Sequence, residues 1–276
     1  MVKMDRQDEV RKITEKLESA VVELVSSDRY KDWLVTMSKF HSYSLNNTIL
    51  ILCQKPDAKR VAGYKTWQSL GRQVRKGEKS IRILAPCPFK KTIKDDDGEE
   101  KVVMIPRYRV VGVFDISQTD GPDLPTIYNG PLKDGVDGYE KLLGDLLSIC
   151  PVHVSFDDIE GGANGFFSPG ENRICVKKGM SEAQTIKTLI HEMAHQMLHG
   201  GKCLKDRETK EVEAESVAYT VCNWLGIETD DYSLSYVAGW SSGKDLKELR
   251  GSMEAIRVAS KEMIDRLEKK SESKAA

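Results

Sequence analysis

Long apolar runs are missing from this chain of 276 residues. No stretch approaches the roughly 18 consecutive apolar residues that a membrane-spanning helix needs. The first 20 residues are charged and amphipathic, and they contain no apolar stretch of the kind found in a secretion signal. We therefore expect a protein that does not associate with membranes and that works in the cytoplasm.

Closely spaced cysteines are missing as well. The six cysteines lie far apart, at positions 53, 87, 150, 175, 203 and 222, and none forms a C-x-x-C pair. This spacing argues against a zinc site built from cysteines. Scattered single cysteines are typical of reduced thiols in a cytosolic protein.

Net charge is nearly absent too, at −1, but this value hides an uneven distribution. Between Asp28 and Lys91 there are fourteen Lys and Arg residues against four Asp and Glu residues, a local excess of ten positive charges. The rest of the chain therefore carries a net charge of −11. Such asymmetry indicates that the basic part contacts nucleic acid.

Apolar periodicity predicts an α+β fold. Spacings of three and four predict helices, and alternation through Ile81 and Ile83 predicts a strand. The elements expected in the first half are helices at 5–26 and about 30–39, a short helix closed by Gly71, and strands around 81–83 and 101–119 that flank a solvated hairpin tip at 94–100. This part should be a small, largely antiparallel sheet packed with helices.

Proline and glycine concentrate in residues 121–135, which we interpret as the boundary between two domains, 1–122 and 136–276. The elements expected beyond it are a helix at 139–150, a strand at 152–156, a hairpin at 161–179 with its turn at Pro169-Gly170, and helices at about 181–199, 207–225 and 243–269.

The strongest motif is HEMAH at residues 191–195, an H-E-x-x-H sequence. Two histidines four residues apart share one face of a helix, so both can bind one ion. The surrounding residues predict that helix, because Ser181 and Gln184 form a capping-box pattern and Gly200-Gly201 end the apolar periodicity. We therefore predict His191 and His195 as metal ligands.

The residue types indicate zinc chemistry. Neutral imidazole is a good Zn²⁺ ligand, and catalytic zinc sites use three protein ligands and leave one position open for water. The ion makes that water a nucleophile at neutral pH. Glu192 directly follows the first ligand, so we assign it as the catalytic base that takes the proton of the water and passes it to the leaving amine.

The third ligand is expected on the next predicted helix. Glu211 and Glu215 are four residues apart and share a face with the small residues Ala214 and Ala218, which let two helices approach closely. We interpret Glu211 as the ligand and Glu215 as the carboxylate that holds a ligand histidine by its other ring nitrogen. The opposite assignment of the two glutamates stays open.

Three other histidines have weaker claims. His199 lies on the face of His191 and His195 and offers an alternative third ligand, but a continuous helix carries it about 6 Å beyond His195. Glu213 is expected to point elsewhere on its helix. We therefore assign His199 a peripheral or structural role, and we interpret His41 and His153 as ordinary polar residues.

The basic segment also contains aromatic residues. Single-stranded nucleic acid binders combine a positive groove with aromatic stacking surfaces. The candidate contacts are Lys59, Arg60, Lys65, Arg72, Arg75, Lys76, Lys79, Tyr43 and Asn46. Trp33, Phe40 and Trp67 are expected in the core instead.

Two long segments, 40–86 and VVGVFDISQTDG at 110–121, resemble the N-terminal domain of ArdC-type antirestriction proteins. The segments IHEMAHQMLH and EVEAESVAY resemble the zincin-like peptidase domain of that family and the ImmA/IrrE group. The resemblance covers about residues 10–265. It implies single-stranded DNA binding, an origin in a mobile genetic element, and a metal site of His191, His195 and Glu211 with Glu192 as base. Ala194 stands where many ArdC-like proteins carry glycine.

Two functions follow as hypotheses. In the first, the chain is a zinc metallopeptidase that binds single-stranded DNA and cleaves a protein partner that the sequence does not name. In the second, the chain shields single-stranded DNA, and its zinc domain is structural or regulatory. A protein-interaction module that uses neither site is a third interpretation.

Overall fold

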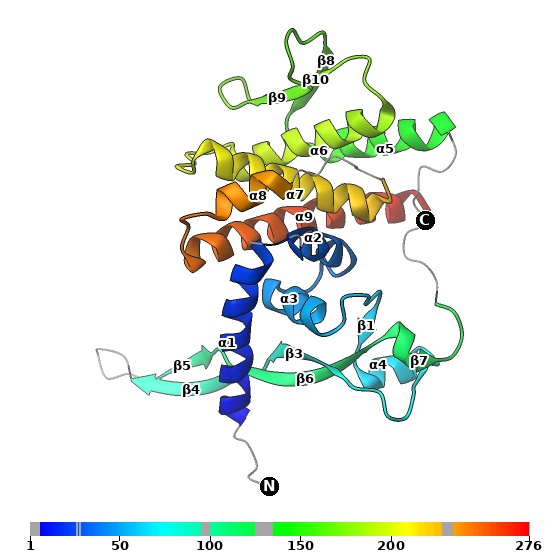
Figure 1. Ribbon diagram of the computed structural model, residues 1–276. Helices are drawn as coiled ribbons and strands as arrows, with labels where there is room; N and C mark the ends of the chain where they lie inside the picture. The colour runs from blue at the N-terminus through cyan, green and yellow to red at the C-terminus, as the bar shows by residue number, and fades with distance from the viewer. Residues whose placement is uncertain are drawn as a thin grey trace. The chain divides into compact units, whose positions relative to one another are not determined.

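The computed structural model describes residues 6–25, 27, 29–94, 100–124, 135–227 and 234–275. By compactness the chain divides into two units (Figure 1), and the first consists of residues 1–20 and 46–124. The second unit consists of residues 21–45 and 125–276, so helix α1 (Arg6–Val25) crosses the division. The sequence-derived domains 1–122 and 136–276 differ from this division in the placement of residues 21–45, and as functional segments they stay a prediction.

The first unit is built on antiparallel strands. Its central sheet has the order β1-β6-β3, and two separate pairs, β2-β7 and β4-β5, complete its strands. The elements after α1 are α3 (Leu45–Gln54), β1 (Val61–Ala62), α4 (Tyr64–Ser69), β2 (Gln73–Val74), β3 (Ile81–Pro86), β4 (Phe89–Lys94), β5 (Glu100–Ile105), β6 (Tyr108–Asp115), η1 (Ile116–Gln118) and β7 (Thr119–Asp120).

Side-chain amides and indoles fasten the helices of the first unit to this sheet. The buried Asn47 of α3 donates to the Leu84 carbonyl and accepts from the Leu84 N–H, both at 2.9 Å, so it pairs with β3 as another strand would. Trp67 of α4 is fully buried and donates its indole N–H to the Phe114 carbonyl of β6 at 2.9 Å. Satisfied polar groups of this kind fix the position of each helix on the sheet.

The second unit packs helices against one small sheet. The sheet has the order β8-β10-β9, with β10 (Arg173–Lys177) parallel to β8 (His153–Asp157) and antiparallel to β9 (Gly165–Ser168). Within this unit, Figure 1 shows the sheet over α6 (Glu182–His199), and α7 (Arg207–Leu225) lies on the other side of α6. The remaining helices are α2 (Arg29–Lys39), α5 (Gly135–Ile149), α8 (Leu234–Ser241) and α9 (Leu246–Ala275).

Local signals place both ends of the two central helices. Ser181 caps α6 by accepting from the Gln184 N–H, and Gly200 follows the last residue of that helix. The Gln184 side chain instead donates to Thr188 at 3.1 Å, so the serine half of the predicted capping box is present. Asp206 caps α7, and Gly226 ends α7 with a positive φ of 74°, a conformation that glycine adopts without strain.

The predicted α+β fold is confirmed. The features that the sequence analysis did not predict include helix α3 within an apolar run, helix α8, the short strands β1 and β2, and the parallel pairing of β8 with β10. Most of the predicted hairpin tip at 94–100 and most of the predicted boundary at 121–135 lie outside the described residues. Across the described chain, every helix is too short or too polar to cross a membrane.

Candidate metal centre

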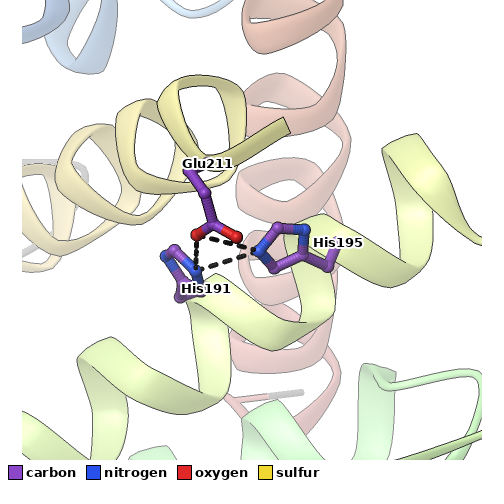
Figure 2. Close-up of side chains that lie close together, drawn as sticks. All are labelled: His191, His195 and Glu211. Carbon is purple, nitrogen blue, oxygen red and sulfur yellow. Dashed lines mark hydrogen bonds and ion pairs between the residues drawn. The ribbon is translucent and has the colours of Figure 1, made fainter. Parts of the chain in front are cut away.

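Helices α6 and α7 bring two imidazoles and one carboxylate together. The Nε2 atoms of His191 and His195 lie 3.0 Å apart. Oε2 of Glu211 lies 3.5 Å from Nε2 of His191 and 3.6 Å from Nε2 of His195. Figure 2 shows the Glu211 side chain reaching from α7 toward the two rings on α6.

These three atoms fit a divalent metal ion. Ligand atoms held tetrahedrally about 2.1 Å from a zinc ion lie roughly 3.4 Å from one another. The three separations in the structure, 3.0, 3.5 and 3.6 Å, bracket that value. Two imidazole nitrogens and one carboxylate oxygen are also the donor set of a common type of catalytic zinc site. The residues present therefore suit such an ion.

The Nδ1 atom of each of these candidate ligand histidines has a partner of its own. Nδ1 of His191 lies 3.2 Å from Oε2 of Glu215, and Lys187 donates to the other oxygen of Glu215 at 2.7 Å. Nδ1 of His195 lies 3.0 Å from Nδ1 of His199. Glu211 thus contacts the Nε2 atoms of both histidines, whereas Glu215 contacts Nδ1 of His191; the ligand role of Glu211 and the orienting role of Glu215 stay a prediction.

The groups that meet at this position shift one another's pKa values. The hydrogen bonds with His191 and His195 hold the pKa of Glu211 far below its ordinary value. Burial favours neutral His191, but its hydrogen bonds with Glu211 and Glu215 outweigh burial and raise the pKa of this imidazole to about 9. The position between the three groups therefore attracts a cation.

Glu192 is buried beside the first ligand. Burial raises the pKa of its carboxyl group, while the neighbouring histidines and a hydrogen bond from the Phe167 main-chain N–H oppose the rise. A carboxylate whose pKa is raised toward neutrality is a better proton acceptor than an exposed glutamate. The residue thus has the environment expected of a catalytic base.

An open cleft of about 1180 Å³ contains the site. Its lining includes all three candidate ligands, Glu192, Glu215, His199 and the β9 residues Gly165, Phe166 and Phe167. A Cβ atom at Gly165 would lie 2.7 Å from Cγ2 of Thr188 and 3.3 Å from Cγ of Glu192. Only glycine therefore allows β9 to approach α6 so closely at the candidate base.

Sequence reasoning missed how His199 and Glu213 are connected. Nε2 of His199 lies 3.0 Å from Oε2 of Glu213, and both side chains are buried. Glu213 does point away from Glu211, into the interior, as expected from helix geometry. Two features of the sequence could have indicated this contact: a histidine one helical turn beyond the motif, and a glutamate between the apolar residues Val212 and Ala214.

The predicted nucleic-acid contacts have different surroundings. Lys59, Lys65, Lys76 and Lys79 are exposed, Arg60 is half-buried, and Asn46 lies in the first turn of α3. Arg72 is buried and donates to Thr119 Oγ1 and to the carbonyls of Thr119, Gly121 and Pro122. Arg75 pairs with Glu78 and Asp120, and Tyr43 belongs to the second unit. The guanidinium of Arg72 is thus engaged inside its own unit.

The aromatic residues divide as expected, with one addition. Trp33 and Trp67 are fully buried and Phe40 nearly so, which confirms that they belong to the core. Besides Tyr64, exposed aromatic rings of the first unit occur at Phe89 and Tyr108, which are 44% and 53% exposed. They accompany the exposed cations of the β4-β5 hairpin and the adjoining strand, namely Lys90, Lys91, Lys101, Arg107 and Arg109. The sequence analysis proposed no nucleic-acid contact in this segment, although F-K-K-T-I-K carries the same mixture of aromatic and basic residues.

A second group of potential ligands lies on α9 and the loop after α2. Nε2 of His41 lies 3.8 Å from Oε1 of Glu268, and Asp265 is near both. Lys261 already donates to Asp265 at 2.5 Å, so a cation is present in this group. His153 is exposed on β8.

Two families match consecutive parts of the chain. Residues 5–114 match the N-terminal domain of anti-restriction factor ArdC. Residues 150–222 match the M78 peptidase family described as the IrrE N-terminal-like domain. The second match contains both histidines of the motif and all three glutamates of α7 discussed above.

Among curated proteins, an uncharacterized protein of Bacillus anthracis is 27% identical over 282 residues. The alignment covers 85% of this chain and 47% of that protein. The chain therefore spans about half the length of the curated relative.

Two solved structures share the fold. The metal-free crystal structure of the antirestriction ArdC protein from plasmid R388 is 24% identical, with a TM-score of 0.55 over 82% of this chain and 84% of that chain. The Mn(II)-bound structure of that protein gives 20% identity and a TM-score of 0.57, over 92% and 97% of the two chains. The two family matches and this shared fold together make the chain similar to ArdC antirestriction proteins in both of its parts.

Proposed function

We propose that the second unit is a metal-dependent peptidase whose ion, zinc, is held by His191, His195 and Glu211. The observation that carries this proposal is the convergence of three ligand atoms next to a buried glutamate in an open cleft. The match to a peptidase family supports it. The antirestriction ArdC protein from plasmid R388 has a Mn(II)-bound structure, which supports a divalent ion in a protein of this fold.

The proposed chemistry divides between the ion and the protein. A divalent ion supplies Lewis acidity, which polarises a carbonyl group and makes water more acidic. Glu192 takes a proton from the attacking water and delivers it to the nitrogen of the leaving amine. Glu211 contributes negative charge, and Glu215 orients the ring of His191.

The cleft also suggests how a peptide binds. Strand β9 lies at the end of its sheet order, beside β10, and three of its residues line the cleft. An exposed strand edge presents N–H and C=O groups that pair with an extended peptide. We therefore propose an extended peptide segment as the substrate.

The test compares wild type with Glu192→Gln on a mixture of synthetic peptides of randomised sequence. The variant should retain its metal, because Glu192 is not a ligand, and should lose about 10²–10⁴-fold in cleavage rate. Metal content and cleavage products are both read by mass spectrometry. An intact peptide mixture after incubation with metal-loaded wild type would contradict the peptidase assignment.

We propose single-stranded DNA as the partner of the first unit. The supporting observation is the joint exposure of aromatic rings and cations on β4-β5 and the start of β6, together with the exposed lysines at 59, 65, 76 and 79. Stacking rings and phosphate-binding cations are the two parts of a sequence-tolerant single-strand site. Protection of DNA from restriction, and a place in a mobile genetic element, extend this proposal.

Two sets of alanine substitutions locate the DNA contacts. The first set replaces Lys90 and Lys91 of β4 and Arg107 between β5 and β6. The second set replaces Lys65 of α4 with Lys76 and Lys79, and Lys16→Ala on α1 is the control. Each phosphate contact that is lost should lower the salt dependence of single-strand binding by about 0.7 in log–log slope. Unchanged slopes in both triple variants would contradict the proposed surface. Equal DNA protection by wild type and Glu192→Gln would show that the two functions are separate.

A further inference from the structure

We propose that Glu213 and His199 are positioning residues that fix the proton of His195 on Nδ1 and so leave its Nε2 free to bind the metal. This inference rests on the proposed metal site and adds two residues to it. It concerns the side chains behind the second ligand, which hold it differently from the first.

The contacts form a continuous line from the cleft into the interior. Nδ1 of His195 meets Nδ1 of His199 at 3.0 Å, and Nε2 of His199 meets Oε2 of Glu213 at 3.0 Å. Lys205 donates to the other oxygen of Glu213, and the Ser252 hydroxyl of α9 is a further hydrogen-bond partner. Glu213 is fully buried, so these partners decide its hydrogen bonding.

The position of each proton follows from the acceptor at the end of this line. A carboxylate only accepts, so His199 must present its Nε2–H to Glu213. The neutral His199 ring then has a lone pair on Nδ1, which accepts the Nδ1–H of His195. His195 in turn keeps a lone pair on Nε2, and this is the atom that faces His191 and Glu211.

The Nδ1 proton of His191 is fixed by a direct contact with a glutamate, without an intervening imidazole. His191 presents its Nδ1–H directly to Glu215, and Lys187 neutralises the far oxygen of that carboxylate. His195 uses an intervening imidazole, and Lys205 takes the place of Lys187. Each ligand ring is therefore oriented by a glutamate that also contacts a lysine, directly in one case and through His199 in the other.

The same geometry excludes His199 as a ligand in this arrangement. Its two ring nitrogens face His195 and Glu213, and neither faces the metal position. The alternative of a third histidine ligand, left open by the motif spacing, is therefore disfavoured. What His199 contributes is an acceptor for His195.

Glu213→Gln tests the relay with almost no change in shape. Lys205 should hold the carbonyl oxygen of the new amide, so that its NH₂ group faces His199 and donates to Nε2. The His199 proton then moves to Nδ1 and opposes the Nδ1–H of His195. We expect zinc affinity, measured by competition with a chelator, to fall about 10- to 100-fold.

A matched control separates this effect from general loss of stability. Ser216 lies on the same helix and is fully buried, and its hydroxyl bonds Tyr30 at 3.1 Å. Ser216→Ala removes a buried hydrogen bond from α7 without touching the relay, so its zinc affinity should stay within about two-fold of wild type. Equal affinities of Glu213→Gln and wild type would overturn the relay. They would leave the metal site itself in place, because wild type would still bind zinc.

A second measurement needs no variant. Nitrogen-15 chemical shifts of the histidine rings report which ring nitrogen carries the proton. In zinc-loaded wild type, His195 should be protonated on Nδ1 and His199 on Nε2. A proton on Nδ1 of His199 would overturn the proposal, even if Glu213→Gln failed to fold. Failure of wild type to bind zinc at all would instead refute the proposed function.

Discussion

Both units bury charged side chains, but they satisfy them with different partners. In the first unit, Asp115 accepts from the main-chain N–H groups of Lys59, Arg60 and Ser117, and Arg72 donates largely to main-chain carbonyls. In the second unit, the buried Glu213 and the half-buried Glu211 and Glu215 contact imidazoles. A charge that binds main chain holds a loop in place. A carboxylate that accepts one ring N–H of an imidazole leaves a lone pair on the other ring nitrogen, which can then bind a further ligand. The partner of a charged side chain, and not its burial alone, therefore indicates a reactive site.

The largest effect should separate the two half-buried glutamates of α7, Glu211 and Glu215. Glu215→Gln should lower zinc affinity about 10- to 100-fold, the usual loss when a residue that orients a ligand is changed. Glu211→Gln should lower zinc affinity by more than roughly 100-fold. The reason is that one carboxylate faces the metal position and the other faces the back of a ring. Chelator competition measures both. The reverse order would exchange the assigned roles.

A smaller effect should distinguish an engaged cation from an exposed one in the first unit. Arg72→Ala leaves three carbonyls without their donor and should lower the free energy of unfolding by about 2–4 kcal/mol. Lys76→Ala should change it by less than about 0.5 kcal/mol, because that side chain is exposed. Urea unfolding measures both variants. Comparable stabilities would mean that Arg72 is not a structural residue.

The smallest effect concerns how the free energy of unfolding falls at acid pH. Burial opposes ionisation of Asp115, but hydrogen bonds from Ser117, Arg60 and Lys59 outweigh it and lower its pKa. A lowered folded-state pKa gives stability that is present above the unfolded value of about 3.9 and is lost as the pH falls toward the folded value. Asp115→Asn should cost about 1–2 kcal/mol at pH 7.

The difference between Asp115→Asn and wild type should shrink below about pH 4, as the aspartate itself becomes protonated. Asp123→Asn, at an exposed position, serves as the control and should follow wild type throughout. Thermal unfolding between pH 2.5 and 7 gives the profiles. A gap of constant size across this range would show that ionised Asp115 contributes nothing.

The sequence predicted those parts of the site that a single helix specifies. His191 and His195 share a face because of their spacing, and Ser181 and Gly200 mark the ends of that helix. Glu211 required a guess about how a second helix approaches, for which the small residues of α7 were the only signal. The link between His199 and Glu213 depends on which way a glutamate turns once the helices have packed, and no spacing within one element encodes that.

The same reasoning explains the remaining differences in the fold. Helix α3 lies in the run LNNTILILC, whose nearly continuous apolar residues show neither helical nor strand periodicity. In the sequence β9 lies between β8 and β10, but in the sheet β8 and β10 are neighbours. Their parallel pairing therefore depends on how the whole sheet assembles. The exposed hairpin β4-β5 consists of strands whose two faces are both mixed, so alternation gave no face to assign.

Gly165 has a consequence that reaches beyond its own strand. Because there is no room for even a methyl group between β9 and α6 at this point, the backbone sits directly over the candidate base, and the N–H of Phe167 reaches its carboxylate. A larger residue at position 165 would lift the strand and remove that donor from Glu192. It would also move the edge along which a peptide would lie. One absent side chain thus brings the Phe167 N–H to the carboxyl group of Glu192 and fixes how closely β9 approaches the cleft.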